Sequence, residues 1–141
     1  MALIATLWLA PAAGANVLKA PPRPVVVADG GAHRQAAQGS YCWAYRGGGL
    51  CADALDPIEF APELGALAGS AITVRMGYPI KSLRAYGADF NTEIDLDPLD
   101  DRRRKFELTL PDSQPGGRID IYLQATYDRG DGLFAIRVRV T

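Results

Sequence analysis

The sequence contains one histidine and two cysteines, so it offers few side chains for catalytic or metal chemistry. A zinc site needs about four ligands, and His33, Cys42 and Cys51 do not make that number. The Cys-x-x-Cys motif of thioredoxin-like enzymes is absent, and so is the Gly-x-Ser-x-Gly motif of many hydrolases. The sequence therefore predicts no catalytic residue, no metal site and no cofactor.

An excess of charge of either sign and a membrane-spanning run are also missing. The formal net charge is −1, so bulk electrostatics draws the chain neither to nucleic acid nor to acidic lipid. The uncharged, mostly apolar run at 2–10 is shorter than the roughly 20 residues that a transmembrane helix needs. We expect no nucleic-acid partner and no transmembrane segment.

The first 23 residues have the character of a leader followed by a linker. An apolar stretch leads into Ala13-Gly14-Ala15, which has the small-x-small form of a signal peptidase site, although no basic residues precede it. Three prolines at 21, 22 and 24 favour an extended linker. We predict a signal peptide and Pro-rich linker over 1–23, outside the core, and a single domain over 24–141. A buried N-terminal strand or helix is the alternative for the leader.

Alternation of apolar and polar residues, the period of a half-buried strand, recurs along the rest of the chain. It is found at 70–76, 93–97 and 105–110, and most clearly at 118–127 and 133–140. The last two runs predict an antiparallel hairpin joined by a loop at 128–132, with its inner face buried: Ile121, Leu123, Ile136 and Val138.

About seven or eight short strands and frequent turns predict an all-β fold. Gly and Pro supply 15 and 10 of the 141 residues, which favours short strands over long helices. An antiparallel β-sandwich is the first choice and a small β-barrel the alternative, with one helical turn expected at 62–67.

The two cysteines lie nine positions apart, and Cys42 is flanked by the aromatic residues Tyr41 and Trp43. Because they are the only pair in a chain with a leader-like start, we predict that Cys42 and Cys51 form a disulfide. Such bonds persist in oxidising compartments, so the predicted location is extracytoplasmic, either secreted or at the cell envelope. We expect the Trp43 ring to cover the sulfurs.

The segments 39–43 (Gly-Ser-Tyr-Cys-Trp) and 51–53 (Cys-Ala-Asp) together resemble a pattern in uncharacterised secreted bacterial proteins. The stretch 106–111 and the closing hairpin with Gly130-Asp131 resemble the last strands of immunoglobulin-like sandwiches. The resemblance covers 39–141. It implies an extracytoplasmic immunoglobulin-like β-sandwich and brings no known activity.

Three residues are candidates for binding. Tyr122 should point to the wet side of its strand, where an aromatic ring is suited to contact a ligand. Arg129 and Asp131 belong to an Arg-Gly-Asp sequence, the integrin-binding tripeptide, at the expected hairpin tip. The same sequence also suits a tight turn, so the motif alone decides nothing.

Two other groups of polar residues have simpler explanations. His33 would have to serve a Ser-His-Asp triad alone, with Ser40 as a candidate nucleophile, and a surface histidine is the simpler reading. Asp95, Asp97, Asp100 and Asp101 precede four basic residues at 102–105. Calcium binding stays open there, but a solvated loop of paired charges is the favoured interpretation.

The predicted function is a non-catalytic extracytoplasmic binding or accessory module at the cell envelope, with an unknown protein or glycan as partner. A small secreted hydrolase and a purely structural module of a larger assembly are the alternatives, because sandwiches host many functions. A concave pocket joining His33, Ser and Asp would favour the enzyme, and a flat or aromatic exposed patch would favour binding. The sequence does not indicate the oligomeric state.

Overall fold

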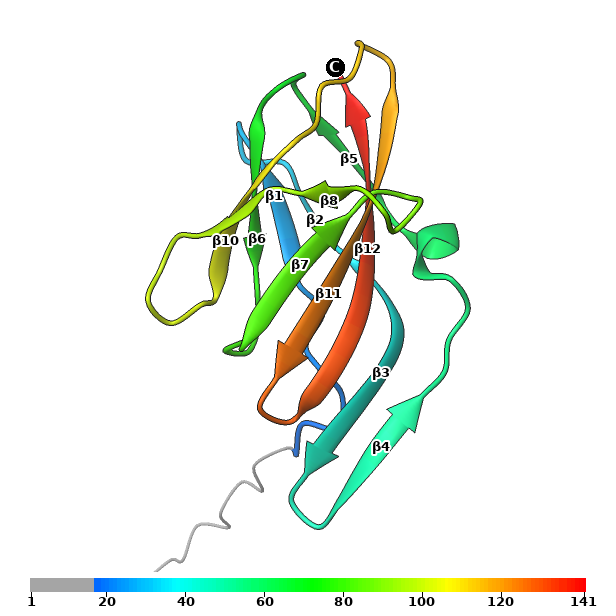
Figure 1. Ribbon diagram of the computed structural model, residues 1–141, viewed down its shortest axis with the longest axis vertical. Helices are drawn as coiled ribbons and strands as arrows, with labels where there is room; N and C mark the ends of the chain where they lie inside the picture. Colours follow the sequence, from blue (N-terminus) through cyan, green and yellow to red (C-terminus); the bar gives the residue numbers. More distant parts are fainter. Residues whose placement is uncertain (1–16) are drawn as a thin grey trace, which may run out of the picture.

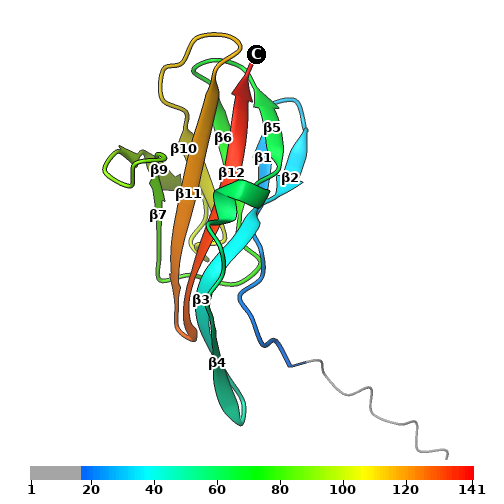
Figure 2. The same ribbon diagram turned by 90° about the vertical axis from the view of Figure 1, so that its right-hand side faces the viewer.

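The computed structural model describes residues 17–141, which form two β-sheets packed face to face (Figures 1 and 2). The five-stranded sheet has the order β2-β1-β6-β10-β9. Its strands are β1 (Val25–Ala28), β2 (His33–Gln35), β6 (Ala71–Arg75), β9 (Leu96–Pro98) and β10 (Lys105–Thr109). The sheets are not closed into a barrel, so the predicted sandwich is confirmed.

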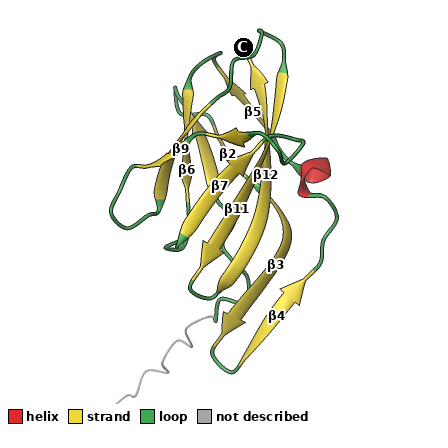
Figure 3. Cartoon of the chain, in the orientation of Figure 1, coloured by secondary structure: helices red, strands yellow, loops and turns green. Residues whose placement is uncertain are grey.

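The seven-stranded sheet has the order β4-β3-β12-β11-β7-β8, with β5 paired in parallel to β12. Its strands are β3 (Ala37–Tyr45), β4 (Gly48–Ala52), β5 (Glu63–Ala66), β7 (Ser82–Tyr86), β8 (Glu93–Ile94), β11 (Arg118–Tyr127) and β12 (Gly130–Val140). One short 3₁₀ helix, η1 (Pro57–Phe60), is the only helix in the described part of the chain (Figure 3). No helix among these residues has the length and apolar character to cross a bilayer.

The strand order is that of an immunoglobulin-like sandwich. Strands β1, β6, β10 and β9 occupy the places of A, B, E and D, while β12, β11, β7 and β8 occupy those of G, F, C and C′. Between β1 and β6 the chain inserts β2, β3, β4, η1 and β5. This insertion and the division of 93–98 into β8 and β9 explain why there are more strands than the seven or eight expected.

The core lies between the two sheets and is built from the apolar side of each alternating strand. The closing hairpin is confirmed, since β11 and β12 pair antiparallel over ten positions and Ile121, Leu123, Ile136 and Val138 are fully buried. The five-stranded sheet supplies the opposing side chains, among them Val26, Ile72, Val74, Phe106 and Leu108. Because the pleat alternates, each of these strands has one dry face and one wet face.

Strand β5 replaces the helical turn that we expected over 62–67, so that expectation is wrong. Glu63 to Ala66 pair in parallel with Arg137 to Val140 of β12. Leu64 and Ala66 are buried, which is the alternation of a strand. The helical turn occurs earlier, where Asp56 caps the 3₁₀ helix: its side chain accepts the N–H of Ile58 at 3.0 Å, and proline follows it.

Residues 1–16 lie outside the described residues, so the leader prediction is not tested. The Pro-rich segment that follows them is packed against the domain, contrary to the expectation that all of 1–23 lies outside the core. The Trp43 indole N–H donates to the carbonyl of Leu18 at 3.0 Å, and the Gln38 side chain donates to that of Pro21 at 3.1 Å. Pro21 is buried. The prolines therefore stiffen a segment that contacts the sheet.

Three aromatic rings close one end of the core. Trp43 contacts Tyr78 and Tyr127 edge to face, with ring centroids 5.2 and 5.1 Å apart. Such contacts add to the stabilisation from burial. The Tyr127 hydroxyl is buried and has no hydrogen-bond partner among the described residues, and burial raises the pKa of this tyrosine. An unpaired buried hydroxyl costs stability.

We therefore expect the Tyr127→Phe variant to be more stable than the wild type by about 1 kcal/mol, because the substitution removes an unpaired polar group and keeps the ring. The control is Tyr122→Phe, which removes a hydroxyl that does donate a hydrogen bond, to Asp56. That variant should lose about 1 kcal/mol. Urea unfolding of both variants measures the two shifts, and shifts of the same sign would contradict the argument.

Candidate functional site

Strands β3 and β4 form a hairpin that projects beyond the body of the sandwich (Figure 2). Residues Arg46 and Gly47 make its two-residue turn, and Gly47 has the positive φ of 93° that glycine adopts most easily. Gly48 and Gly49 belong to β4. We call residues 37–52 the β3–β4 arm.

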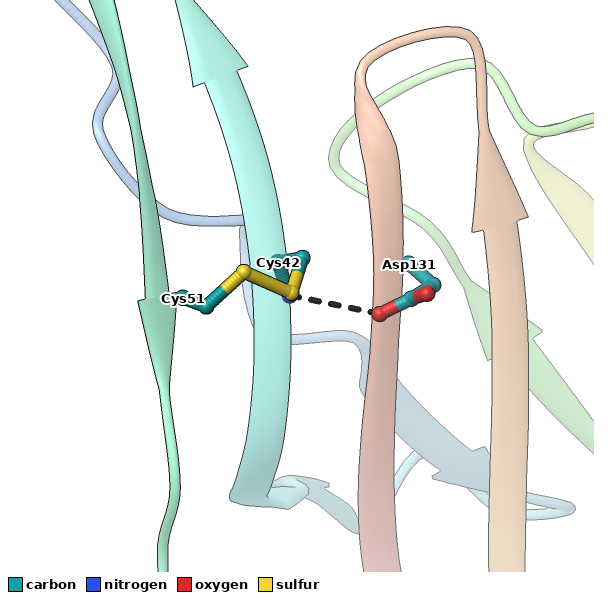
Figure 4. The surroundings of a disulfide bond; sticks show 3 residues. All are labelled: Cys42, Cys51 and Asp131. Atoms are coloured by element: carbon teal, nitrogen blue, oxygen red, sulfur yellow. Dashed lines mark hydrogen bonds between the residues drawn. A yellow bond between two sulfur atoms is a disulfide. The ribbon is translucent and has the colours of Figure 1, made fainter.

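The predicted disulfide is confirmed and lies in this arm. Cys42 and Cys51 face each other across β3 and β4 and are joined by an S–S bond of 2.05 Å (Figure 4). Cys51 is exposed and Cys42 partly exposed. The bond therefore ties two neighbouring strands of one sheet together on its outer face, whereas immunoglobulin domains join their two sheets through the core.

The expectation that Trp43 covers the sulfurs is wrong. Successive side chains of a strand point to opposite faces, so Cys42 on the outer face requires Trp43 on the inner face. Trp43 is 1% exposed and packs within the core. Trp43 and Cys42 are neighbours in sequence, but their side chains lie on opposite faces of the sheet because they occupy successive positions of one strand.

A second feature of the outer face is an aromatic patch made of Tyr86, Phe90 and Tyr122. Phe90 stacks on Tyr122 with ring centroids 4.2 Å apart, and its centroid is 6.2 Å from that of Tyr86. Phe90 is 48% exposed. Arg84 lies over the Tyr86 ring and pairs through both oxygens with Glu93, so charged side chains border the patch.

Tyr122, predicted to contact a ligand directly, lies at the base of this patch. It is on the outer face, as its strand period required, but it is only 3% exposed because Phe90 covers it. Its hydroxyl donates to both carboxylate oxygens of Asp56, at 2.7 and 2.9 Å. Burial, followed by this hydrogen bond, raises the pKa of Tyr122 to about 12. Tyr122 thus supports the patch, and Phe90 is its accessible ring.

The turn that carries Phe90 is built around Asp89. The Asp89 carboxylate accepts the backbone N–H groups of Asn91 and Thr92, both at 3.1 Å, and these bonds lower its pKa. Phe90 itself has a φ of 57°, in the left-handed region that a bulky residue seldom occupies. Nothing in the local sequence marks this phenylalanine, and sequence reasoning did not single it out.

Exposed apolar side chains also occur next to Asp56. Leu55 precedes it and Phe60 ends η1, and these side chains are 68% and 65% exposed. The hydrogen bonds between Asp56 and Tyr122 hold this segment against β11. Apolar groups that gather on one face of a soluble protein are typical of an interaction surface.

Arg129 and Asp131 do not share a loop tip. The turn is shorter than we expected, since Tyr127 pairs with Gly130 and only Asp128 and Arg129 connect the strands. The guanidinium of Arg129 lies 5.5 Å from the Tyr78 ring centroid. Asp131 is already in β12, and its carboxylate accepts the backbone N–H of Cys42 at 3.2 Å (Figure 4). Asp131 therefore joins β12 to the β3–β4 arm.

Gly130, the middle residue of this tripeptide, is required by packing. It has a φ of 148°, and a side chain there would collide with the carbonyl oxygen of Cys42. The close approach of β12 to β3 therefore explains why glycine occupies this position.

The residues weighed for catalysis are separated by the fold. His33 lies in β2 of the five-stranded sheet, exposed, with its ring nitrogen 3.4 Å from the Gly31 carbonyl. Ser40 lies in β3 of the other sheet and accepts the N–H of Ala54. A surface hollow of about 430 Å³ includes Asp95 and Asp97 but not His33.

The acidic residues 95–101 are spread along the chain: Asp95 lies between β8 and β9, Asp97 lies in β9, and Asp100 and Asp101 lie in the turn that follows. Asp100 accepts the N–H groups of Arg104 and Lys105 at 2.9 and 3.1 Å, and the bond from Arg104 is the main cause of its lowered pKa. Within 17–141, no three His, Cys, Asp or Glu side chains come together as metal ligands would. Asp100 thus shapes the turn before β10.

Comparison with protein families, with curated proteins and with solved structures finds no match to this chain. The fold assignment therefore depends on strand order and register.

We expect replacement of both cysteines by serine to lower the free energy of unfolding by about 2–3 kcal/mol, since the bond closes a short loop in the unfolded chain. The sandwich should stay folded, because the cysteines lie outside its core. Amide hydrogen exchange should accelerate in β4 and stay slow in β11 and β12. Faster exchange throughout the sheet would show that the arm is not locally stabilised by its disulfide.

Proposed function

We propose that the protein is a non-catalytic extracytoplasmic module that binds a partner protein through the outer face of its seven-stranded sheet. The observation that carries this proposal is Phe90, a half-exposed ring held above the sheet by Tyr122 in a backbone conformation that costs free energy. Phe90 covers Tyr122, but about half of Phe90 itself is left in solvent, and the fold alone gives no reason for a phenylalanine at a left-handed position. A binding role accounts for its presence.

A protein partner suits the composition of this face. Aromatic and arginine side chains carry much of the binding energy at protein interfaces, and Phe90, Tyr86 and Arg84 lie together. The exposed apolar side chains of Leu55 and Phe60 enlarge the apolar area beyond the aromatic patch. A glycan would require more hydrogen-bonding groups around the exposed ring.

The non-catalytic part of the proposal is supported by the distance in the fold between the residues that a hydrolase would need. His33 and Ser40 belong to different sheets, and each side chain interacts with a backbone group instead of with the other. The extracytoplasmic part is supported by the solvent-accessible disulfide, which a reducing compartment would tend to open. We also propose that the protein is related to the secreted bacterial proteins that its cysteine motif resembles.

The binding proposal predicts that Phe90→Ala captures partner protein from a cell-envelope extract at least tenfold less than the wild type, because an anchoring aromatic is typically worth about 2 kcal/mol or more. Leu99→Ala is the matched control, since Leu99 is similarly exposed, at 52%, on a different loop. Quantitative mass spectrometry of proteins retained on the immobilised full chain provides the measurement.

Equal capture by both variants would remove Phe90 from the interface and refute the proposal. A glycan array run with the same variants tests the other class of partner. Glycan binding that is lost in Phe90→Ala would assign the face to carbohydrate instead of protein.

The location predicts an exported chain that carries an intact disulfide. Expressed in its source cell, the protein should be recovered outside the cytoplasm, with a mass 2 Da below that of the reduced chain because two thiol hydrogens are lost per bond. Intact mass measurement before and after reduction checks this. Recovery of the reduced chain from the cytoplasm alone would contradict the proposed location.

A further inference from the structure

The edges of the two sheets differ in how they are protected against pairing with other strands. Natural edge strands are commonly short, charged or interrupted by proline. Strand β2 carries Arg34, β8 is two residues long and contains Glu93, and β9 contains Asp97 and Pro98. Strand β5, which has one partner, also contacts β1 and β2. In contrast, β4 has five residues, no charge and no proline.

The hydrogen bonds of β3 show which backbone groups of β4 point away from β3, toward the outer edge of the sheet. The backbone N–H groups of Cys42 and Ala44 both donate toward the β11–β12 hairpin, at 3.2 and 2.7 Å, and so point away from β4. Their opposite residues in β4 are Cys51 and Gly49. In an antiparallel pair these are non-hydrogen-bonded positions, so Cys51 and Gly49 direct their N–H and C=O groups to the free edge.

We propose that this edge pairs with β4 of a second copy of the chain, antiparallel and about a two-fold axis at Leu50. In this register Gly49 of each copy lies opposite Cys51 of the other, so the four outward N–H and C=O groups of each strand find partners. Leu50, 44% exposed in the single chain, meets Leu50 of the second copy across the axis.

The charges that flank β4 favour a second copy in this orientation. Arg46 precedes the strand and Asp53 follows it, and both are exposed. Antiparallel pairing brings the Arg46 end of one strand beside the Asp53 end of the other, which places unlike charges together. Parallel pairing would place like charges together, and this is unfavourable across strands.

The disulfide makes the edge ready for pairing. It fixes β4 to β3, so little conformational entropy remains to be lost when a further strand is added. The arm projects from the body of the sandwich (Figures 1 and 2), and within residues 17–141 no strand pairs with the outer edge of β4. Addition of a strand to a sheet edge is an established mode of protein recognition.

The test is sedimentation of the full 141-residue chain over a range of concentrations, with paired charge variants of Leu50. The wild type should form a reversible dimer. Leu50→Lys and Leu50→Glu should each raise its dissociation constant about tenfold or more, because each places like charges across the axis. An equimolar mixture of the two should restore the dimer, since the charges are then unlike.

Two further variants separate pairing from folding. Gly49→Pro removes one outward N–H and leaves the bonds between β3 and β4 intact, so it should also weaken the dimer. Leu67→Lys alters another exposed leucine, 63% exposed and outside β4, and should dimerise as the wild type does. Circular dichroism and intact mass confirm that each variant is folded and oxidised.

Three results would overturn the proposal: a wild type that is monomeric at every concentration, charge variants that dimerise as tightly as the wild type, or a mixture that fails to recover the dimer. Hydrogen exchange tests whether a segment of the same chain, and not a second copy, pairs with the edge of β4. Slow exchange at Gly49 and Cys51 in a monomeric sample would mean that another segment of the same chain covers the edge.

Discussion

The seven-stranded sheet depends on β12, which is paired along both of its sides. It pairs with β11 over its length on one side, and on the other with β3 over its first half and β5 over its second. The register with β3 shifts between Gly132 and Phe134. Glycine at 130 and 132 allows β3 and the Pro21 ring to approach closely. A side chain at position 130 would collide with the Cys42 carbonyl oxygen, so the close pairing of β3 with β12 requires glycine there.

The parts of the fold that the sequence predicts are those in which neighbouring residues alone decide the structure. In the closing hairpin, alternation over ten positions specifies the buried face. A one-residue slip of either strand would turn its core residues, Ile121 and Leu123 or Ile136 and Val138, to solvent, so the register is strongly determined. The two cysteines were predictable as a pair for a similar reason, since they are close in sequence and have no competitor. Local signals of this kind were enough to predict the fold class, the disulfide and the outward direction of Tyr122.

The features that escaped prediction depend on contacts between distant segments. Strand β5 is four residues long, and only its pairing with β12, more than 70 positions later, distinguishes it from a helical turn. The burial of Tyr122 requires Asp56 and Phe90, which belong to separate loops. The prolines near residue 21 suggested a linker that does not touch the domain. The structure instead packs this segment against the domain, where the carbonyl of Leu18 accepts the Trp43 indole N–H. Sequence alone specifies which face a side chain takes, and it leaves open what covers that face.

The aromatic patch and the β3–β4 arm belong to the same sheet and complement one another. A two-fold axis perpendicular to the sheet at β4 keeps the outer face of each copy on the same side, because such a rotation does not exchange the faces of a sheet. The two Phe90 rings of a dimer would then be presented together to a partner surface. Two weak sites held together bind a repetitive surface far more tightly than one, through the high effective concentration of the second site. Pairing at β4 would therefore increase the avidity of binding at Phe90 without any change in the patch itself.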